Sequence, residues 1–108
     1  MDLKLSNKVA IVTGASRGIG ESISKKLASN GVKVAIISRN LDALNQVASN
    51  INSKSILPLE CDVTDFLSFQ KICAKIYKKW GKIDILVNNA GVTRDKILLR
   101  LSNDDWDR

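Results

Sequence analysis

At 108 residues, the chain has room for one domain of modest size. Hydrophobic residues make up 44% of it and charged residues 26%, which is typical of a globular protein rather than a disordered or fibrous one. Without a long apolar run, a signal peptide, histidine or more than two cysteines, we expect a cytoplasmic protein with no membrane span, disulfide framework or metal site.

The net charge of +6 raises the possibility of a nucleic-acid-binding protein. The lysines do not cluster, however, and many fall in stretches whose apolar residues recur at helical spacing. We therefore interpret them as solvated outer faces of helices and expect no nucleic-acid partner. Attraction to an anionic ligand or an acidic protein remains open. These lysines are Lys25, Lys26, Lys71, Lys75, Lys78 and Lys79.

The first third of the chain alternates apolar runs with an amphipathic stretch. The run Val9–Val12 predicts a strand that is buried on both faces of a sheet. Apolar residues four apart, from Ile19 to Leu27, then predict a helix that ends at Gly31. Residues 32–37, which are apolar apart from Lys33, predict a second buried strand.

The same alternation continues to residue 87. Apolar spacing predicts a second helix over residues 41–51, and residues 55–60 predict a third strand. Pro58 places that strand at an edge, because proline cannot donate to a ladder. A third helix is predicted to begin near Thr64–Asp65 and to end at Trp80–Gly81, and residues 85–87 predict a fourth buried strand.

Alternating strands and helices predict right-handed crossovers and a doubly wound parallel α/β sheet. We expect the strand order 3-2-1-4, with a ligand crevice at the carboxyl ends of the first and fourth strands. Such a sheet is only half complete, and its fourth strand is predicted to be an exposed apolar edge. Residues 102–105 resemble the cap of a further helix, which Arg108 interrupts.

The stretch Thr13–Gly20 lies where the first strand meets the first helix. Gly14 permits a tight turn, Gly18 lets the backbone approach a phosphate, and Gly20 allows close packing of helix on sheet. The helix N-terminus offers free N–H groups and a positive dipole end to a pyrophosphate. This context predicts a dinucleotide site, although turns also use glycine for purely structural reasons.

The end of the second strand commonly decides between the two nicotinamide cofactors. An acidic residue there binds a ribose 2′-hydroxyl, whereas arginine accommodates a 2′-phosphate. This chain has Ser38-Arg39-Asn40, and Arg17 in the glycine loop offers a second guanidinium. We therefore expect NADPH rather than NADH, the alternative being that both arginines are merely exposed.

Two further loops follow strands at the same predicted edge. Asp62 is placed to accept a hydrogen bond from an adenine amino group, with Val63 behind the ring; the alternative is that Asp62 or Thr64 caps the next helix. Cys61 is interpreted as a packing residue. The small residues of Asn88-Asn89-Ala90-Gly91 let the backbone approach a ribose, although the segment is also compatible with an ordinary turn.

Together these motifs resemble the short-chain dehydrogenase/reductase family, with its Rossmann-like fold, over essentially the whole chain. The Thr13–Gly20 loop, the Asp62-Val63 pair and Asn88–Gly91 match the landmarks of that family in order and spacing. Residues 92–101, followed by Trp106, are similar to one branch, the bacterial 3-oxoacyl-[acyl-carrier-protein] reductases. The resemblance implies NADPH-dependent reduction of a carrier-linked 3-oxoacyl thioester in fatty acid synthesis, by an enzyme that is typically a tetramer.

The resemblance also implies roles for individual residues. The pyrophosphate and the 2′-phosphate would be held by Gly14, Ala15, Ser16, Arg17, Gly18 and Ile19, with Arg39 also at the 2′-phosphate. Asp62 and Val63 would frame the adenine, Asn89, Ala90 and Gly91 would line the ribose, and Asn88 would brace the sheet.

The chain departs from the family in length, because members are about twice as long. Their catalytic asparagine, serine and Tyr-x-x-x-Lys pair would follow Arg108, and Tyr77, the only tyrosine, has no lysine four residues on. We therefore assign no catalytic residue and interpret residues 1–108 as the N-terminal part of a single NADP-binding Rossmann domain, inactive alone and lacking the catalytic part. The alternatives are another short-chain carbonyl reductase, such as a sugar or steroid dehydrogenase, and a non-catalytic NADP-binding module.

Overall fold

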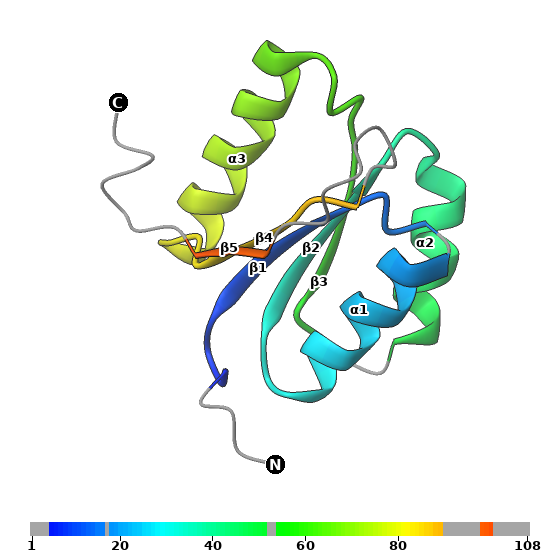
Figure 1. Cartoon of the computed structure of the whole chain (residues 1–108), viewed down its shortest axis with the longest axis vertical. Coiled ribbons are helices and arrows are strands. Elements are labelled where there is room, and N and C mark those ends of the chain that lie inside the picture. The colour runs from blue at the N-terminus through cyan, green and yellow to red at the C-terminus, as the bar shows by residue number, and fades with distance from the viewer. Residues whose placement is uncertain (1–4, 17, 52–53, 90–97, 101–108) are drawn as a thin grey trace.

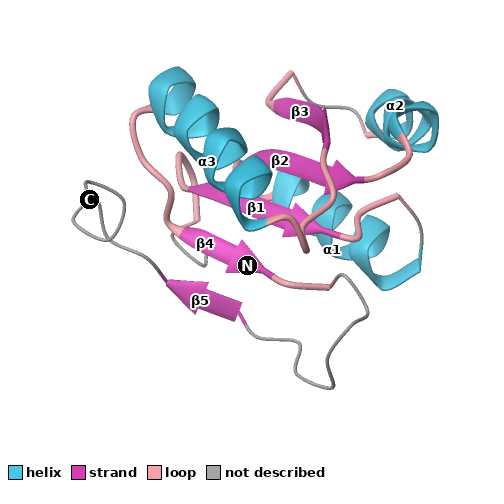
Figure 2. Cartoon of the chain, turned by 90° about the horizontal axis from the view of Figure 1, so that it is seen from above, coloured by secondary structure: helices cyan, strands magenta, loops and turns pink. Residues whose placement is uncertain are grey.

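The structure is a computed structural model, which describes residues 5–16, 18–51, 54–89 and 98–100. Its strands form one sheet in the order β3-β2-β1-β4-β5 (Figures 1 and 2). The strands are β1 (Val9–Thr13), β2 (Lys33–Ser38), β3 (Ile56–Glu60), β4 (Ile85–Val87) and β5 (Leu98–Arg100). The helices are α1 (Gly18–Ser29), α2 (Leu41–Asn50) and α3 (Phe66–Trp80).

The first four strands are parallel and confirm the predicted order 3-2-1-4. β3 lies at the edge of the sheet, as Pro58 indicated, and Pro58 pairs in register with Ile36 of β2. The described residues therefore form the N-terminal strands and helices of a doubly wound α/β fold of the Rossmann type.

Helices cover both faces of the sheet, with α3 on one side and α1 and α2 on the other (Figure 1). Along β1, Val9 and Ile11 pack in the cluster that includes α3, whereas Ala10 and Val12 pack in the cluster that includes α2. Successive side chains of a strand point to opposite faces, and helices cover both faces of this sheet, so all four side chains are fully buried. The structure thus confirms the strand buried on both faces that the continuous apolar run predicted.

The apolar residues that predicted α1 are not equally buried in it. Ile19 is 54% exposed, whereas Gly20 and Ser24 are the buried residues of α1. Residues four apart share a helix face, so the buried row runs through residues 20 and 24 and leaves residue 19 on the flank. Ile23 and Leu27 pack partly against the core.

The prediction of an exposed edge at β4 is wrong, because β5 pairs with β4 in antiparallel fashion, with Leu86 opposite Leu99. An unpaired apolar strand presents free N–H and C=O groups, and a strand as short as β5 is sufficient to pair with them. The helix cap predicted at residues 102–105 lies outside the described residues.

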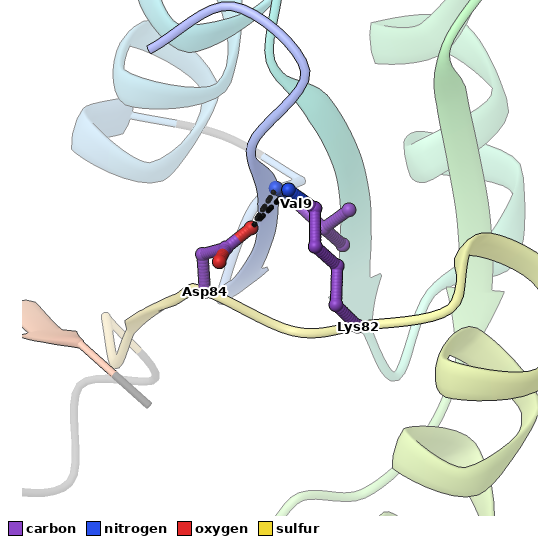
Figure 3. Close-up of polar contacts among 3 residues, drawn as sticks. All are labelled: Val9, Lys82 and Asp84. Atoms are coloured by element: carbon purple, nitrogen blue, oxygen red, sulfur yellow. Dashed lines mark hydrogen bonds and ion pairs between the residues drawn. The ribbon is translucent and has the colours of Figure 1, made fainter. Parts of the chain in front are cut away.

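A polar contact joins β1 and β4 at their amino ends (Figure 3). The backbone N–H of Val9 donates to Oδ2 of Asp84 at 2.9 Å, and the N–H of Asp84 donates to the carbonyl of Val9 at 2.9 Å. Lys82 Nζ lies 3.4 Å from the same Asp84 oxygen.

In the described part of the chain, no helix is long and apolar enough to cross a membrane.

Candidate functional site

A groove of about 1000 Å³ opens at the carboxyl ends of β1, β2, β3 and β4, in the place predicted for a ligand crevice. Its walls come from the β1–α1 turn and from the segments that follow β2, β3 and β4. Of the predicted site residues, those that line it are Gly14, Ser16, Gly18, Arg39, Asp62, Val63 and Asn89.

Of the remaining predicted site residues, two are described but do not line the groove, and three lie outside the described residues. Ala15 is fully buried in the core, and its N–H donates to the carbonyl of Ile37, so it holds the loop against β2 instead of lining the groove. Ile19 is exposed on α1 outside the groove lining. Arg17, Ala90 and Gly91 lie outside the described residues.

The glycine loop has the geometry that its sequence requires. Gly14 and Gly18 adopt φ values of +62° and +63°, which glycine adopts at no steric cost. A Cβ atom at Gly20 would overlap the carbonyl oxygen of Gly14 and would lie 2.9 Å from Nδ2 of Asn89. The β1–α1 turn, α1 and the segment after β4 therefore meet at a point where only glycine fits.

The first turn of α1 follows this loop directly, at Gly18. The first N–H groups of a helix have no partner within the helix, and they lie at its positive dipole end. Because Gly14, Ser16 and Gly18 all line the groove, that helix end is suited to hold an anion such as a pyrophosphate.

The turn between β2 and α2 presents Arg39 at the groove. Ser38 Oγ accepts a hydrogen bond from the N–H of Asn40 at 3.0 Å, and Asn40 Oδ1 accepts one from the N–H of Ala43 at 3.1 Å. Asn40 thus caps α2. Arg39 lies exposed between these two fixed residues and is the one cationic side chain in the groove lining given by the described residues.

The segment after β3 presents a carboxylate. Oδ1 of Asp62 accepts hydrogen bonds from the N–H of Thr64 at 2.9 Å and from its hydroxyl at 2.6 Å. These two bonds, led by the hydroxyl, lower the pKa of Asp62, and the charge of Arg39 adds a smaller lowering. Neither Asp62 nor Thr64 caps α3, because Asp65 does so by accepting from Ser68.

The end of β4 is fixed to β1 through Thr13. The hydroxyl of Thr13 donates to Oδ1 of Asn88 at 3.1 Å and accepts from the N–H of Asn89 at 2.9 Å. Asn88 therefore contacts β1 in the way expected of a brace, while Asn89 lines the groove.

Cys61 and Cys73 are both buried, with 7% and 1% exposure. Burial raises the pKa of each thiol, to about 12 for Cys73. A thiol in this state is a poor nucleophile at neutral pH, which fits the interpretation of Cys61 as a packing residue.

Sequence reasoning missed part of the lining, namely Ile37, Ser38, Asn40, Ala43, Cys61 and Thr64. A signal was present for Asn40, because asparagine just before an amphipathic stretch is a common helix cap. The bond from Thr64 to Asp62 had a weaker signal, the tendency of aspartate to bind the backbone two residues on.

Comparisons with known proteins agree on one family. The sequence profile described as short chain dehydrogenase matches residues 8–108. The 3-oxoacyl-[acyl-carrier-protein] reductase FabG of Thermotoga maritima is 39% identical over 108 residues, which cover 97% of this chain and 44% of that protein.

Solved structures give the same result. A metagenomic short-chain oxidoreductase in complex with NADP has a TM-score of 0.76 and 37% identity, over 81% of this chain and 40% of that one. The 3-ketoacyl-(acyl-carrier-protein) reductase of Brucella melitensis, complexed with NADH, has a TM-score of 0.71 and 34% identity, over 76% of this chain and 33% of that one. The chain spans less than half the length of the curated relatives that it matches.

Proposed function

The chain belongs to the short-chain dehydrogenase family, and we propose that it is the NADPH-binding part of an oxidoreductase that reduces a 3-oxoacyl-[acyl-carrier-protein] thioester. The groove carries the dinucleotide part of this proposal, because its glycine turn packs against Asn89 and its other end presents Arg39 and Asp62. The similarity to the 3-oxoacyl-[acyl-carrier-protein] reductase of Thermotoga maritima supports the substrate. When bound, the nicotinamide supplies the hydride. The residues of this chain bind and orient the dinucleotide.

The residues present fit such a cofactor along the whole groove. The glycine turn and the N-terminus of α1 would hold the pyrophosphate, with Gly14, Ser16 and Gly18 in the lining. Asp62 and Val63 would contact the adenine, and Asn89 the adjoining ribose. Arg17, Ala90 and Gly91 are proposed for the phosphate and ribose contacts that the family resemblance implies.

Arg39 supports NADPH over NADH. This residue lines the groove directly after β2, where its guanidinium could bind a phosphate on the adenosine ribose. The described β2–α2 turn holds no carboxylate that could bind a 2′-hydroxyl instead. Of the two solved structures described above, one contains NADP and the other NADH, so the preference rests on this residue.

The cofactor preference is tested by measuring equilibrium dissociation constants for NADPH and NADH in Arg39→Ala. Loss of the arginine–phosphate contact is expected to weaken NADPH binding by roughly tenfold or more while NADH binding changes little. Lys54→Ala is the matched control, since Lys54 is an exposed cation outside the groove lining. Equal weakening of both dinucleotides, or the same effect in the control, would contradict the preference.

The activity is tested on the product of the complete reading frame. We propose that the catalytic serine and the Tyr-x-x-x-Lys pair follow Arg108, and sequencing the coding DNA past that codon shows whether they are encoded. If they are, the complete product is expected to oxidise NADPH with an acetoacetyl thioester, to act on carrier-linked substrates and to form a tetramer. Residues 1–108 alone are expected to bind NADPH without turnover. A complete product that binds NADPH but reduces no 3-oxoacyl thioester would point to another carbonyl substrate or to a non-catalytic module.

A further inference from the structure

We propose that Thr64 is a positioning residue for nucleotide recognition: its hydroxyl fixes the carboxylate of Asp62 so that the second oxygen, Oδ2, is available to accept a hydrogen bond from the exocyclic amino group of adenine. The inference rests on the proposed binding of a nicotinamide dinucleotide. It assigns to Thr64 a role in selecting an amino-bearing purine.

The first observation is the pair of hydrogen bonds from Thr64. Its N–H and its hydroxyl both donate to Oδ1 of Asp62, at 2.9 and 2.6 Å. Both residues are exposed and both line the groove. An exposed carboxylate ordinarily rotates about its side-chain bonds, so two bonds to one of its oxygens restrict it before a ligand arrives.

The second observation is the contrast with Asp65, three residues further on. Asp65 uses both oxygens locally, since Oδ1 accepts from the N–H of Ser68 at 3.2 Å and Oδ2 accepts from its hydroxyl at 2.8 Å. Oδ2 of Asp62, by comparison, accepts no hydrogen bond from the residues that the structure describes. The two carboxylates therefore differ. Both oxygens of Asp65 accept hydrogen bonds at the N-terminus of α3, whereas one oxygen of Asp62 remains available to accept a hydrogen bond at the groove.

The third observation concerns ionisation. The pKa of Asp62 is lowered, first by the hydroxyl of Thr64, then by its N–H, with a smaller contribution from Arg39. An ionised carboxylate is purely an acceptor, which matches an amino group and rejects a carbonyl oxygen at the same position. Thr64 thus favours the charge state as well as the orientation that the contact requires.

The binding experiment compares NADPH with its 6-deamino analogue, in which hypoxanthine replaces adenine. In the wild-type protein, produced from its complete reading frame, we expect the analogue to bind roughly tenfold more weakly, the scale of one hydrogen bond to a charged group at an exposed site. Thr64→Val keeps the shape of the side chain and removes its hydroxyl. It is expected to reduce that ratio to about two by weakening NADPH binding, with analogue binding unchanged.

Two control variants accompany the measurement. Thr64→Ser retains the hydroxyl and is expected to retain the ratio. Ser68→Ala removes an equivalent hydroxyl–carboxylate bond at Asp65, outside the groove lining, and is also expected to retain it. Equal weakening of both dinucleotides by Thr64→Val, or a wild-type ratio near one, would overturn the role of Thr64 and leave dinucleotide binding standing.

A second readout needs no cofactor. An NMR titration of the Asp62 carboxyl carbon is expected to show a higher pKa in Thr64→Val than in the wild type, with the wild-type value largely kept in Thr64→Ser and Ser68→Ala. An unchanged Asp62 titration in Thr64→Val would overturn the inference. If the titration moves as expected but neither dinucleotide binds to the wild type, the proposed function fails, whereas the link between Thr64 and Asp62 stands.

Discussion

The parallel strands β1 and β4 are joined by one polar side chain at each end. At their amino ends, Asp84 accepts from the N–H of Val9, and the backbones of the same two residues are bonded as well. At their carboxyl ends, the hydroxyl of Thr13 donates to Asn88 and accepts from the N–H of Asn89. Both contacts fix the same pair of strands, but only the second one adjoins the groove.

The difference separates stability from binding. Asp84 and its partners are absent from the groove lining, so their contact acts on the sheet alone. Thr13 holds Asn89, which lines the groove and whose Nδ2 lies beside Gly20. We therefore expect changes at the amino end to alter the free energy of unfolding, and changes at the carboxyl end to alter both that free energy and NADPH affinity.

The largest effect is expected for Gly20→Ala, in α1 beside the carboxyl ends of β1 and β4. The added Cβ would overlap the carbonyl oxygen of Gly14, which is backbone and cannot move aside cheaply. We expect a loss of about 3 kcal/mol in the free energy of unfolding and no measurable NADPH binding, as measured by urea denaturation and by titration.

Gly18→Ala is the matched control for that variant. A Cβ at Gly18 meets no atom of the described residues within 4 Å, so the cost is that of a left-handed backbone, about 1 kcal/mol. If the two alanine variants lose equal stability, the close contact of α1 with the β1–α1 turn is not what requires glycine at residue 20.

At the amino end, Asp84→Ala is expected to destabilise the fold without affecting cofactor binding. It leaves the buried N–H of Val9 without its acceptor, at a cost of about 2 kcal/mol. Lys82→Ala removes only a part-exposed ion pair, so a change below about 0.5 kcal/mol is expected. A large loss of NADPH affinity in a folded Asp84→Ala protein would remove the distinction between the two ends.

Thr13→Val tests the carboxyl end with a smaller change. The variant keeps the volume of the side chain and deprives the N–H of Asn89 of its partner, so we expect a loss of about 1 kcal/mol and a roughly threefold weaker affinity for NADPH. Thr13→Ser, which retains the hydroxyl, is expected to behave like the wild type in both assays. Unchanged affinity in a destabilised Thr13→Val protein would show that Asn89 does not depend on Thr13.

The sequence predicted most of the fold because the signals were strong and local. Apolar runs such as Val9–Val12 occur where a strand is buried on both faces, and their alternation with amphipathic stretches leaves few topologies open. The glycine loop was also readable, since the positive φ of Gly14 and the contact at Gly20 both need a residue without a side chain.

The failures have a common physical cause, which is dependence on contacts between distant residues. Whether β4 keeps a free edge depends on its pairing with Leu98–Arg100. A strand of three residues is too short to show a recognisable apolar periodicity in the sequence. The apolar spacing of Ile19, Ile23 and Leu27 does not show which of them is buried, because the approach of α1 to Gly14 places Gly20 at the contact and leaves Ile19 exposed. Asp84 gave no signal at all, because its partner, Val9, lies 75 residues away.

The smallest effect is expected from acid, and it tests the carboxylate that caps α3 near the groove. The pKa of Asp65 is lowered, chiefly by the hydroxyl of Ser68 and then by its N–H. A carboxyl group whose pKa is lower in the folded state adds stability above its ordinary pKa of 3.8 and loses it as pH falls through the folded value. The comparison is with Asp65→Asn, because asparagine is an equally good cap and does not titrate. We expect the urea midpoint of the wild type to exceed that of Asp65→Asn slightly at neutral pH, and the difference to shrink as the pH falls below 3.8. A difference that stays constant through this range would show that Ser68 does not stabilise the ionised form of Asp65.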